Sequence, residues 1–162
     1  MILEIWPGKL ALQWRLVTDA VMGGVSRGTV TKETLEGRSA VRMRGEVSTQ
    51  NNGGFLQIAL DFDQKTGSFD ASSFSGVEID VFGNHQIYGA HLRTIELSRP
   101  QQSYRQEFVT TAAWQSLRLP LAQFLPHRTD MPLNTTRLSR IGLVAIGREF
   151  TADLSVARLT FY

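Results

Sequence analysis

The chain has 162 residues, of which 42% are hydrophobic and 20% are charged, and its formal net charge is +2. This length and composition favour one globular domain over residues 1–162 and argue against disorder. The small net charge gives no reason to expect a nucleic acid partner. Because the sequence contains no cysteine, disulfides, Cys-ligated metals, iron–sulfur clusters and cysteine nucleophiles are excluded.

The first residues, 1–7, lack the basic region and apolar stretch that mark a secretory signal. No apolar run reaches the roughly 20 residues that a membrane-spanning helix needs. We therefore expect a cytoplasmic protein without a transmembrane segment.

Short segments in which apolar and polar residues alternate predict β-strands along the whole chain. Residues 63–75 and 126–136 are predicted loops, residues 121–124 form one helical turn, and Pro120 indicates a strand end or sheet edge. Without a convincing helix of ten residues, the pattern indicates an all-β sandwich or barrel. The predicted strands cover residues 12–17, 28–32, 39–45, 55–62, 76–83, 87–97, 104–110, 116–121, 141–146 and 154–162.

Two glycine-rich segments, residues 19–26 and 51–55, are the least generic parts of the sequence. Adjacent glycines allow positive φ and let another backbone or a ligand come close. We expect the two segments to meet at one rim of the β-fold and to form a binding surface there. The candidate binding residues of this rim are Asp19, Met22, Gly23, Gly24, Ser26, Asn52, Gly53, Gly54 and Phe55.

These residues have a functional and a structural interpretation. In the first, Asp19 accepts hydrogen bonds from a ligand and Met22 offers an adaptable apolar contact. In the second, Asp19 caps a turn, the glycines permit a tight bend, and Met22 and Phe55 belong to the core. Neither segment is a dinucleotide fingerprint or a P-loop, because no helix follows a strand there and the Gly-Lys-Ser/Thr ending is missing.

Arg93 is a further candidate, because an arginine on a sheet face could bind a carboxylate or sugar hydroxyls. It could equally be a surface residue or the partner of an aspartate. Tyr104 and Trp114 could stack on a sugar ring, although aromatic residues in a sandwich also serve as core or edge packing.

Metal binding and catalysis find little support. None of the histidines has a second ligand at a recognisable metal spacing. The hard ligands available for a loop calcium are Asp61, Asp63 and Asp70, which solvated loops explain as well. We therefore expect no metal and no cofactor. We also expect no catalytic residue, because no serine has a recognisable activating base. The histidines are His85, His91 and His127.

The order of these signals resembles the complex I intermediate-associated protein 30 family, over a stretch from Trp14 to Tyr162. The first landmarks are Asp-x-Val-Met-Gly-Gly-x-Ser at residues 19–26 and Gly-Gly-Phe at residues 53–55. The resemblance implies a galactose-binding-like jelly-roll β-sandwich. The later landmarks are Phe74-Ser75-Gly76, Leu92-Arg93-Thr94, Trp114, Leu119-Pro120 and Ile141-Gly142-Leu143.

Mitochondrial members of that family assist the assembly of respiratory complex I. The resemblance therefore implies a non-catalytic, chaperone-like binding domain whose partner is a protein, such as a respiratory-complex subunit. One alternative, by analogy of fold, is a carbohydrate- or small-ligand-binding module. Another is an enzyme, which would need a deep pocket with converging titratable groups.

Overall fold

The structure, a computed structural model, describes residues 1–8, 12–62 and 67–162. These residues form two six-stranded antiparallel sheets and short 3-10 turns. Sheet A contains β1 (Leu3–Trp6), β3 (Arg27–Leu35), β4 (Arg38–Val47), β6 (Gly76–Phe82), β9 (Trp114–Pro120) and β12 (Phe150–Phe161). Sheet B contains β2 (Arg15–Thr18), β5 (Phe55–Asp61), β7 (Ile87–Thr94), β8 (Ser103–Val109), β10 (Leu125–His127) and β11 (Leu138–Ile146). The 3-10 turns are η1 (Asp19–Met22), η2 (Gln50–Asn52), η3 (Leu121–Gln123) and η4 (Thr135–Arg137).

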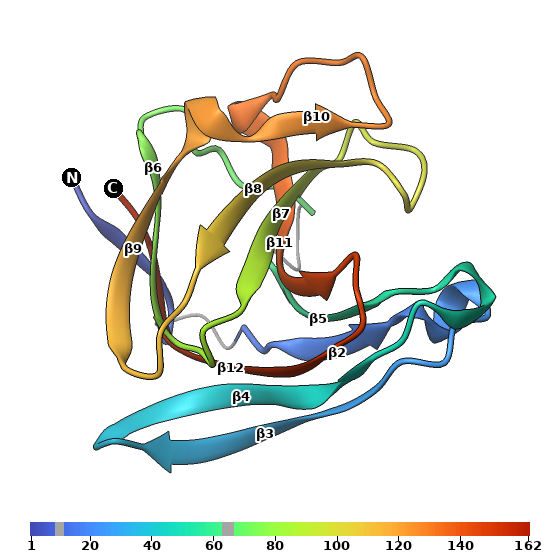
Figure 1. Ribbon diagram of the computed structural model, residues 1–162. Coiled ribbons are helices and arrows are strands. Elements are labelled where there is room, and N and C mark those ends of the chain that lie inside the picture. The colour runs from blue at the N-terminus through green and yellow to red at the C-terminus, as the bar shows by residue number, and fades with distance from the viewer. Residues whose placement is uncertain (9–11, 63–66) are drawn as a thin grey trace.

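Sheet A has the order β3-β4-β12-β6-β9, with β1 paired to β12, and sheet B has the order β10-β8-β7-β11-β5-β2. In Figure 1, β9 and β6 lie at the left and β12 runs from the left along the bottom above β4, whereas β10, β8 and β7 lie at the top and centre. The two termini lie close together at the upper left. The predicted all-β sandwich is confirmed, and no helix of the described residues is long and apolar enough to cross a membrane.

The core lies between the two sheets, because each strand turns alternate side chains inward. In β5 the inward residues Leu56, Ile58 and Leu60 are fully buried. In β7 the core residues Ala90 and Leu92 alternate with residues that face away from the core. Sheet B therefore has an outer face built from the other half of each strand.

Several predicted boundaries are wrong. Leu12 and Trp14 are buried, but β2 begins only at Arg15. The structure adds β1 at the N-terminus and extends the last strand back to Phe150. Both segments are strands because they pair with segments distant in the sequence: β1 with β12, and Phe150 with Val47 of β4. The predicted loop 126–136 contains most of β10, which alternation does not reveal because it has only three residues.

Candidate functional site

The two glycine-rich turns meet around Asp19, whose side chain is completely buried. Its carboxylate accepts hydrogen bonds from the backbone N–H groups of Ser26 at 3.0 Å, Gly54 at 2.7 Å and Phe55 at 3.2 Å. The hydroxyl of Ser26 donates to the same carboxylate. Asp19, the first residue of η1, thus connects this turn to the start of β5, and Figure 1 shows the two turns together at the right edge of the molecule. We call this group of hydrogen bonds the Asp19 junction.

The junction keeps its aspartate ionised. Burial alone would raise the pKa of Asp19, but the hydrogen bonds from Ser26, Gly54 and Phe55 together lower that pKa below its ordinary value. The Ser26 hydroxyl also accepts a hydrogen bond of 2.8 Å from the backbone N–H of Ser48. The junction therefore also holds the chain just after β4.

Two of the glycines are required by the close packing of this junction. A Cβ added at Gly24 would lie 2.4 Å from the Asp19 Cγ atom. A Cβ added at Gly53 would lie 2.6 Å from the Asp19 Oδ2 atom and 2.9 Å from the Gly24 Cα atom. Gly23 differs, because nothing lies within 4 Å of its added Cβ. Glycine is favoured there by the left-handed backbone conformation, with a φ of 83°.

The structure therefore brings together most of the predicted rim residues, but it uses their polar groups to hold the fold. The side chains of Met22 and Asn52 lie outside the described part of the chain. Phe55 is half-buried and stands opposite Ile146 in the pairing of β5 with β11.

Arg93 lies away from this junction and also has a structural role. Its Nη1 atom donates to the carbonyl oxygens of Arg99 at 3.0 Å and Pro100 at 3.3 Å, and to that of Gln102. Burial, followed by the nearby Arg140 cation, lowers its pKa. Arg93 therefore holds the turn between β7 and β8.

The two candidate stacking residues are also engaged inside the protein. Tyr104 is fully buried, and its hydroxyl donates to the carbonyl of Met131 at 3.0 Å. Trp114 is half-buried, and its indole N–H donates to the carbonyl of Leu35 at 3.0 Å. The Tyr104 ring is therefore closed to a sugar, and the Arg38 guanidinium lies over the Trp114 ring, 5.0 Å from its centre.

Nothing in the described residues groups three metal-binding side chains. Asp61 forms an ion pair of 2.9 Å with Arg140, and Asp70 accepts a 2.9 Å hydrogen bond from the backbone N–H of Ser72. The third calcium candidate, Asp63, lies outside the described residues.

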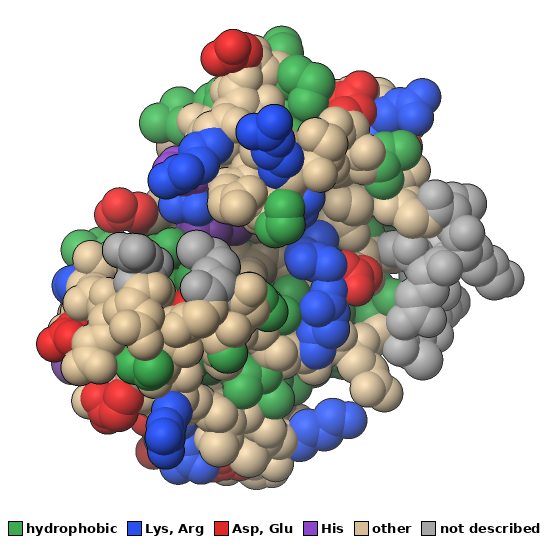
Figure 2. Space-filling model, turned by 90° about the vertical axis from the view of Figure 1, so that its right-hand side faces the viewer, with side chains coloured by type: hydrophobic (Ala, Val, Ile, Leu, Met, Phe, Trp, Pro, Cys, Tyr) green, Lys and Arg blue, Asp and Glu red, His purple; other side chains and the backbone are tan. Residues whose placement is uncertain are grey.

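A different site lies on the outer face of sheet B. A hollow of about 430 Å³ is lined by β7, β8 and the end of β11, and a second of about 400 Å³ extends it over β8 and β10. Both hollows are lined by Arg105, Gln106 and Glu107 of β8. Figure 2 shows this side of the molecule hollowed near its middle, with basic side chains and a histidine beside the hollow.

Strand pairing places His91 at the centre of this face. His91 stands opposite Arg105 of β8 on one side and Gly142 of β11 on the other. It is only 9% exposed, and its imidazole has no hydrogen-bond partner among the residues that the structure describes. Burial, followed by the positive charges of Arg105 and His127, lowers the pKa of His91 to about 3. The imidazole is therefore neutral at physiological pH.

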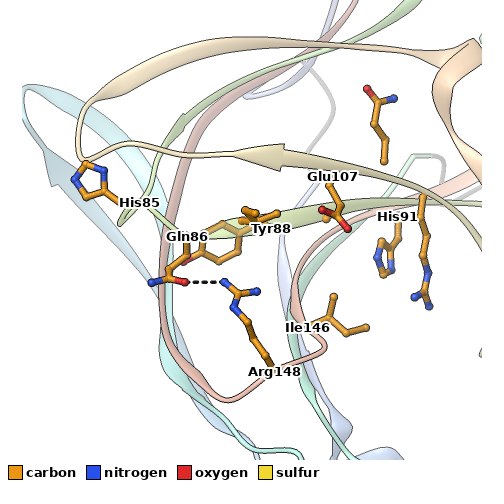
Figure 3. A pocket seen from close by; sticks show the side chains of 11 residues that line it. His85, Gln86, Tyr88, His91, Glu107, Ile146 and Arg148 are labelled. Atoms are coloured by element: carbon orange, nitrogen blue, oxygen red, sulfur yellow. Dashed lines mark hydrogen bonds between the residues drawn. The ribbon is translucent and has the colours of Figure 1, made fainter.

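Two arginines, Arg105 and Arg148, line the first hollow. The Nε atom of Arg105 donates to the Ser103 hydroxyl at 2.8 Å. Arg148 donates to the side-chain oxygen of Gln86 at 2.6 Å, and its guanidinium lies 4.0 Å from the centre of the Phe150 ring. Within the described ranges, neither arginine has a carboxylate within 4.0 Å. Figure 3 shows the dashed bond from Arg148, with His91, Glu107 and Ile146 around the same opening.

Residues 5–156 of the sequence match the family described as complex I intermediate-associated protein 30. The chain belongs to this family. No curated protein matches the sequence.

Solved structures with the fold of this family member include carbohydrate-binding modules. A family 11 module of a Clostridium thermocellum cellulosomal cellulase has a TM-score of 0.73 at 9% identity, covering 99% of this chain and 92% of the module. The family 11 module in complex with a β-1,3-1,4-mixed-linked tetrasaccharide has a TM-score of 0.72 at 10% identity, covering 99% and 94%. A family 30 module of a C. thermocellum cellulase has a TM-score of 0.69 at 10% identity, covering 100% and 97%. At these identities the likeness shows the fold, a galactose-binding-like jelly roll.

The hollows on sheet B are not predicted from the sequence. His91 was considered only as a metal ligand, and Arg105 was not considered at all. The available signal was the alternation of polar and apolar residues through β7 and β8, which assigns His91, Arg105 and Glu107 to outward positions. Their mutual position depends on strand register, which local sequence does not specify.

Proposed function

We propose that this member of the complex I intermediate-associated protein 30 family is a non-catalytic binding domain that holds a segment of a partner protein on the outer face of sheet B. The observation that carries the proposal is the pair of adjoining hollows over β7, β8 and β10. Concave sites with a few placed polar groups are the usual binding sites of folded domains. His91, Arg105 and Arg148 supply such groups.

Exposed aliphatic side chains border the hollows. Ile87 lines the first hollow and is 42% exposed, whereas Leu125 lines the second and is 67% exposed. Val109, which pairs with Ile87, is 62% exposed. No aromatic residue is among the exposed large hydrophobic residues of the described chain. Aliphatic groups beside arginine suit the side chains of a protein, whereas a flat sugar ring is better matched by an aromatic face.

Membership of the family also supports a protein partner, because its name links it to an intermediate of complex I. In this proposal the Asp19 junction stabilises one end of the sandwich, and Phe55 and Ile146 connect that end to the binding face. We therefore assign the binding surface to sheet B instead of the glycine-rich rim that the sequence predicts.

Site-specific photo-crosslinking tests this proposal. A photoreactive amino acid at Leu125, on the rim of the hollow, should crosslink one segment of one protein in the native host. The same group at Lys32, an exposed residue of β3 on sheet A, should not capture that segment. The purified partner should then bind the full chain directly. Identical capture from both positions, or no captured segment that binds when purified, would contradict the proposal.

A second candidate is a carbohydrate-binding module, favoured by the tetrasaccharide complex of a protein with the same fold. Titration with the mixed-linked β-glucan tetrasaccharide distinguishes the two functions. A protein-binding domain should show no heat of binding at millimolar sugar. Saturable binding that is lost when the hollow is altered at Arg105 would favour the carbohydrate function instead.

A further inference from the structure

The charges of the two outer faces are balanced differently. On sheet A, ion pairs tie five arginines to carboxylates at 2.7–3.5 Å. These arginines are Arg38, Arg42, Arg44, Arg118 and Arg158. These five arginines therefore have counter-charges from the protein, whereas the exposed Arg27 of β3 forms no ion pair within the described chain.

On sheet B, only part of the face is balanced in this way. Asp61 pairs with Arg15 at 3.3 Å and with Arg140 at 2.9 Å. Arg105 and Arg148, which line the hollow, lack such a partner in the described part of the chain. Among the described residues that line the two hollows, Glu107 is the single carboxylate, and it is exposed.

A bound anion would stabilise the charged form of Arg105. Burial, followed by the nearby cation of Arg128, lowers its pKa below the ordinary value. Its Nε atom is already bonded to Ser103, and the terminal nitrogens of its guanidinium have no acceptor in the described chain. A guanidinium offers paired donors that match the two oxygens of a carboxylate.

His91 is a second polar side chain that lines the first hollow and has no hydrogen-bond partner in the described chain. Nine-tenths of its surface is buried. A Cβ at Gly89 would lie 3.0 Å from the His91 Nε2 atom, so the glycine leaves room for the ring against the strand. The ring nitrogens are not among the fully buried, unpartnered side-chain atoms of the described chain, so they remain accessible from the hollow and can hydrogen-bond to a bound group.

From these observations we infer that the segment docked on sheet B is acidic and presents a carboxylate to Arg105, with the neutral His91 hydrogen-bonding beside it. The inference rests on the proposed function and specifies the chemistry of its partner. The aliphatic rim formed by Ile87, Val109 and Leu125 then contacts apolar side chains of the same segment. Charge complementarity and this rim together favour an acidic protein segment over a polyanion without apolar groups.

Fluorescence anisotropy with two matched peptides tests the inference. One labelled peptide contains Glu, Leu and Ser, and the other has Gln in place of every Glu. The full chain should bind the Glu peptide about tenfold more tightly than the Gln peptide. That preference should weaken as salt is raised, because salt screens partly exposed charges.

Matched variants locate the effect. Arg105→Gln should lose about tenfold in affinity for the Glu peptide, whereas Arg44→Gln on sheet A removes the same charge and should change the affinity by less than about twofold. Glu107→Gln should tighten binding by about two- to fivefold, because it removes a like charge from the hollow. Misfolding cannot produce a gain in affinity, so the Glu107→Gln variant keeps the inference testable even if the Arg105→Gln variant is unstable.

Equal affinity for both peptides, with a captured partner segment that is not acidic, would overturn this inference and leave the proposed function in place. Binding of neither peptide, together with a Leu125 crosslink to no specific segment, would overturn both. Loss of binding in Arg44→Gln as large as in Arg105→Gln would show a general charge effect and would also overturn the inference.

Discussion

The carboxylate of Asp19 is the most heavily used side chain of the described structure, since three backbone N–H groups and the Ser26 hydroxyl donate to it. Replacing it by alanine would leave these buried donors without an acceptor. We expect Asp19→Ala to lower the free energy of unfolding by about 3–5 kcal/mol, because each buried donor left unsatisfied is costly. Urea denaturation measures this change. A loss below about 1 kcal/mol would contradict the role assigned to Asp19.

The two adjacent glycines of the first turn should respond differently to the same substitution. Gly24→Ala places a methyl group 2.4 Å from the Asp19 Cγ atom, so the junction must open, and we expect a loss of about 2–4 kcal/mol. Gly23→Ala meets only the cost of a φ of 83°, which is about 1–2 kcal/mol. Thermal denaturation of both variants checks the order. Equal losses would mean that the turn has room for a side chain at residue 24.

His91 should make stability depend on pH. Its pKa is near 6.5 in an unfolded chain, and burial lowers it to about 3 in the folded protein, aided by Arg105 and His127. Between these values the unfolded chain binds a proton that the folded protein does not. The free energy of unfolding therefore falls as the pH drops below about 6.5, by about 2 kcal/mol at pH 4.5.

The variant His91→Gln has no such proton to bind. Its loss of stability between pH 7 and pH 4.5 should be smaller than that of the unchanged protein by about the same 2 kcal/mol. Urea denaturation at the two pH values gives the comparison. An identical loss in both proteins would show that His91 is protonated in the fold well above pH 3.

At the scale of elements, the loop between β7 and β8 is held by Arg93 of β7 and by Gln102, whose side-chain oxygen accepts from the N–H groups of Ser98 and Arg99. The Arg93 guanidinium donates to the carbonyls of Arg99, Pro100 and Gln102. Arg93→Ala should therefore speed amide exchange at residues 98–102 by about tenfold, while the strands keep their protection. Arg99→Ala, which removes an exposed side chain from the same loop, should leave exchange near its original rate. Hydrogen exchange read by mass spectrometry distinguishes the two results.

The sequence predicts most strands because alternation and turn residues are local signals. The residues 76–83 and 116–121, for example, largely coincide with β6 and β9, and Pro120 ends an edge strand as expected. β1 and β10 were missed because a short strand is defined by its partner. The partner of β1 is β12, at the other end of the chain, and the partner of β10 is β8.

The candidate site was predicted less well, for a physical reason. The meeting of the two glycine-rich turns followed from their composition, and the hydrogen bonds from Gly54 and Phe55 to Asp19 show that they do meet. The hollow depends on the register that places His91 opposite Arg105, and on charges left without partners after folding. The extent of a single domain and a cytoplasmic location stay predictions from composition.

In the whole molecule, the two outer faces differ in how many of their arginines are paired with carboxylates. Sheet A carries ion pairs across neighbouring strands, such as Arg42 with Asp153 at 2.7 Å. Sheet B carries a hollow that Arg105, Arg148 and His91 line. This asymmetry is what a binding domain needs, because one face can remain inert while the other recognises a partner.

Whether an acidic segment binds the outer face of sheet B can be measured by amide chemical-shift mapping of the isotopically labelled full chain, titrated with the acidic peptide. We expect the perturbed amides to cluster in β7, β8 and β10 and around Arg148, with little change in sheet A. Perturbations centred on residues 19–28 and 50–54, or on the outer face of sheet A, would contradict this expectation.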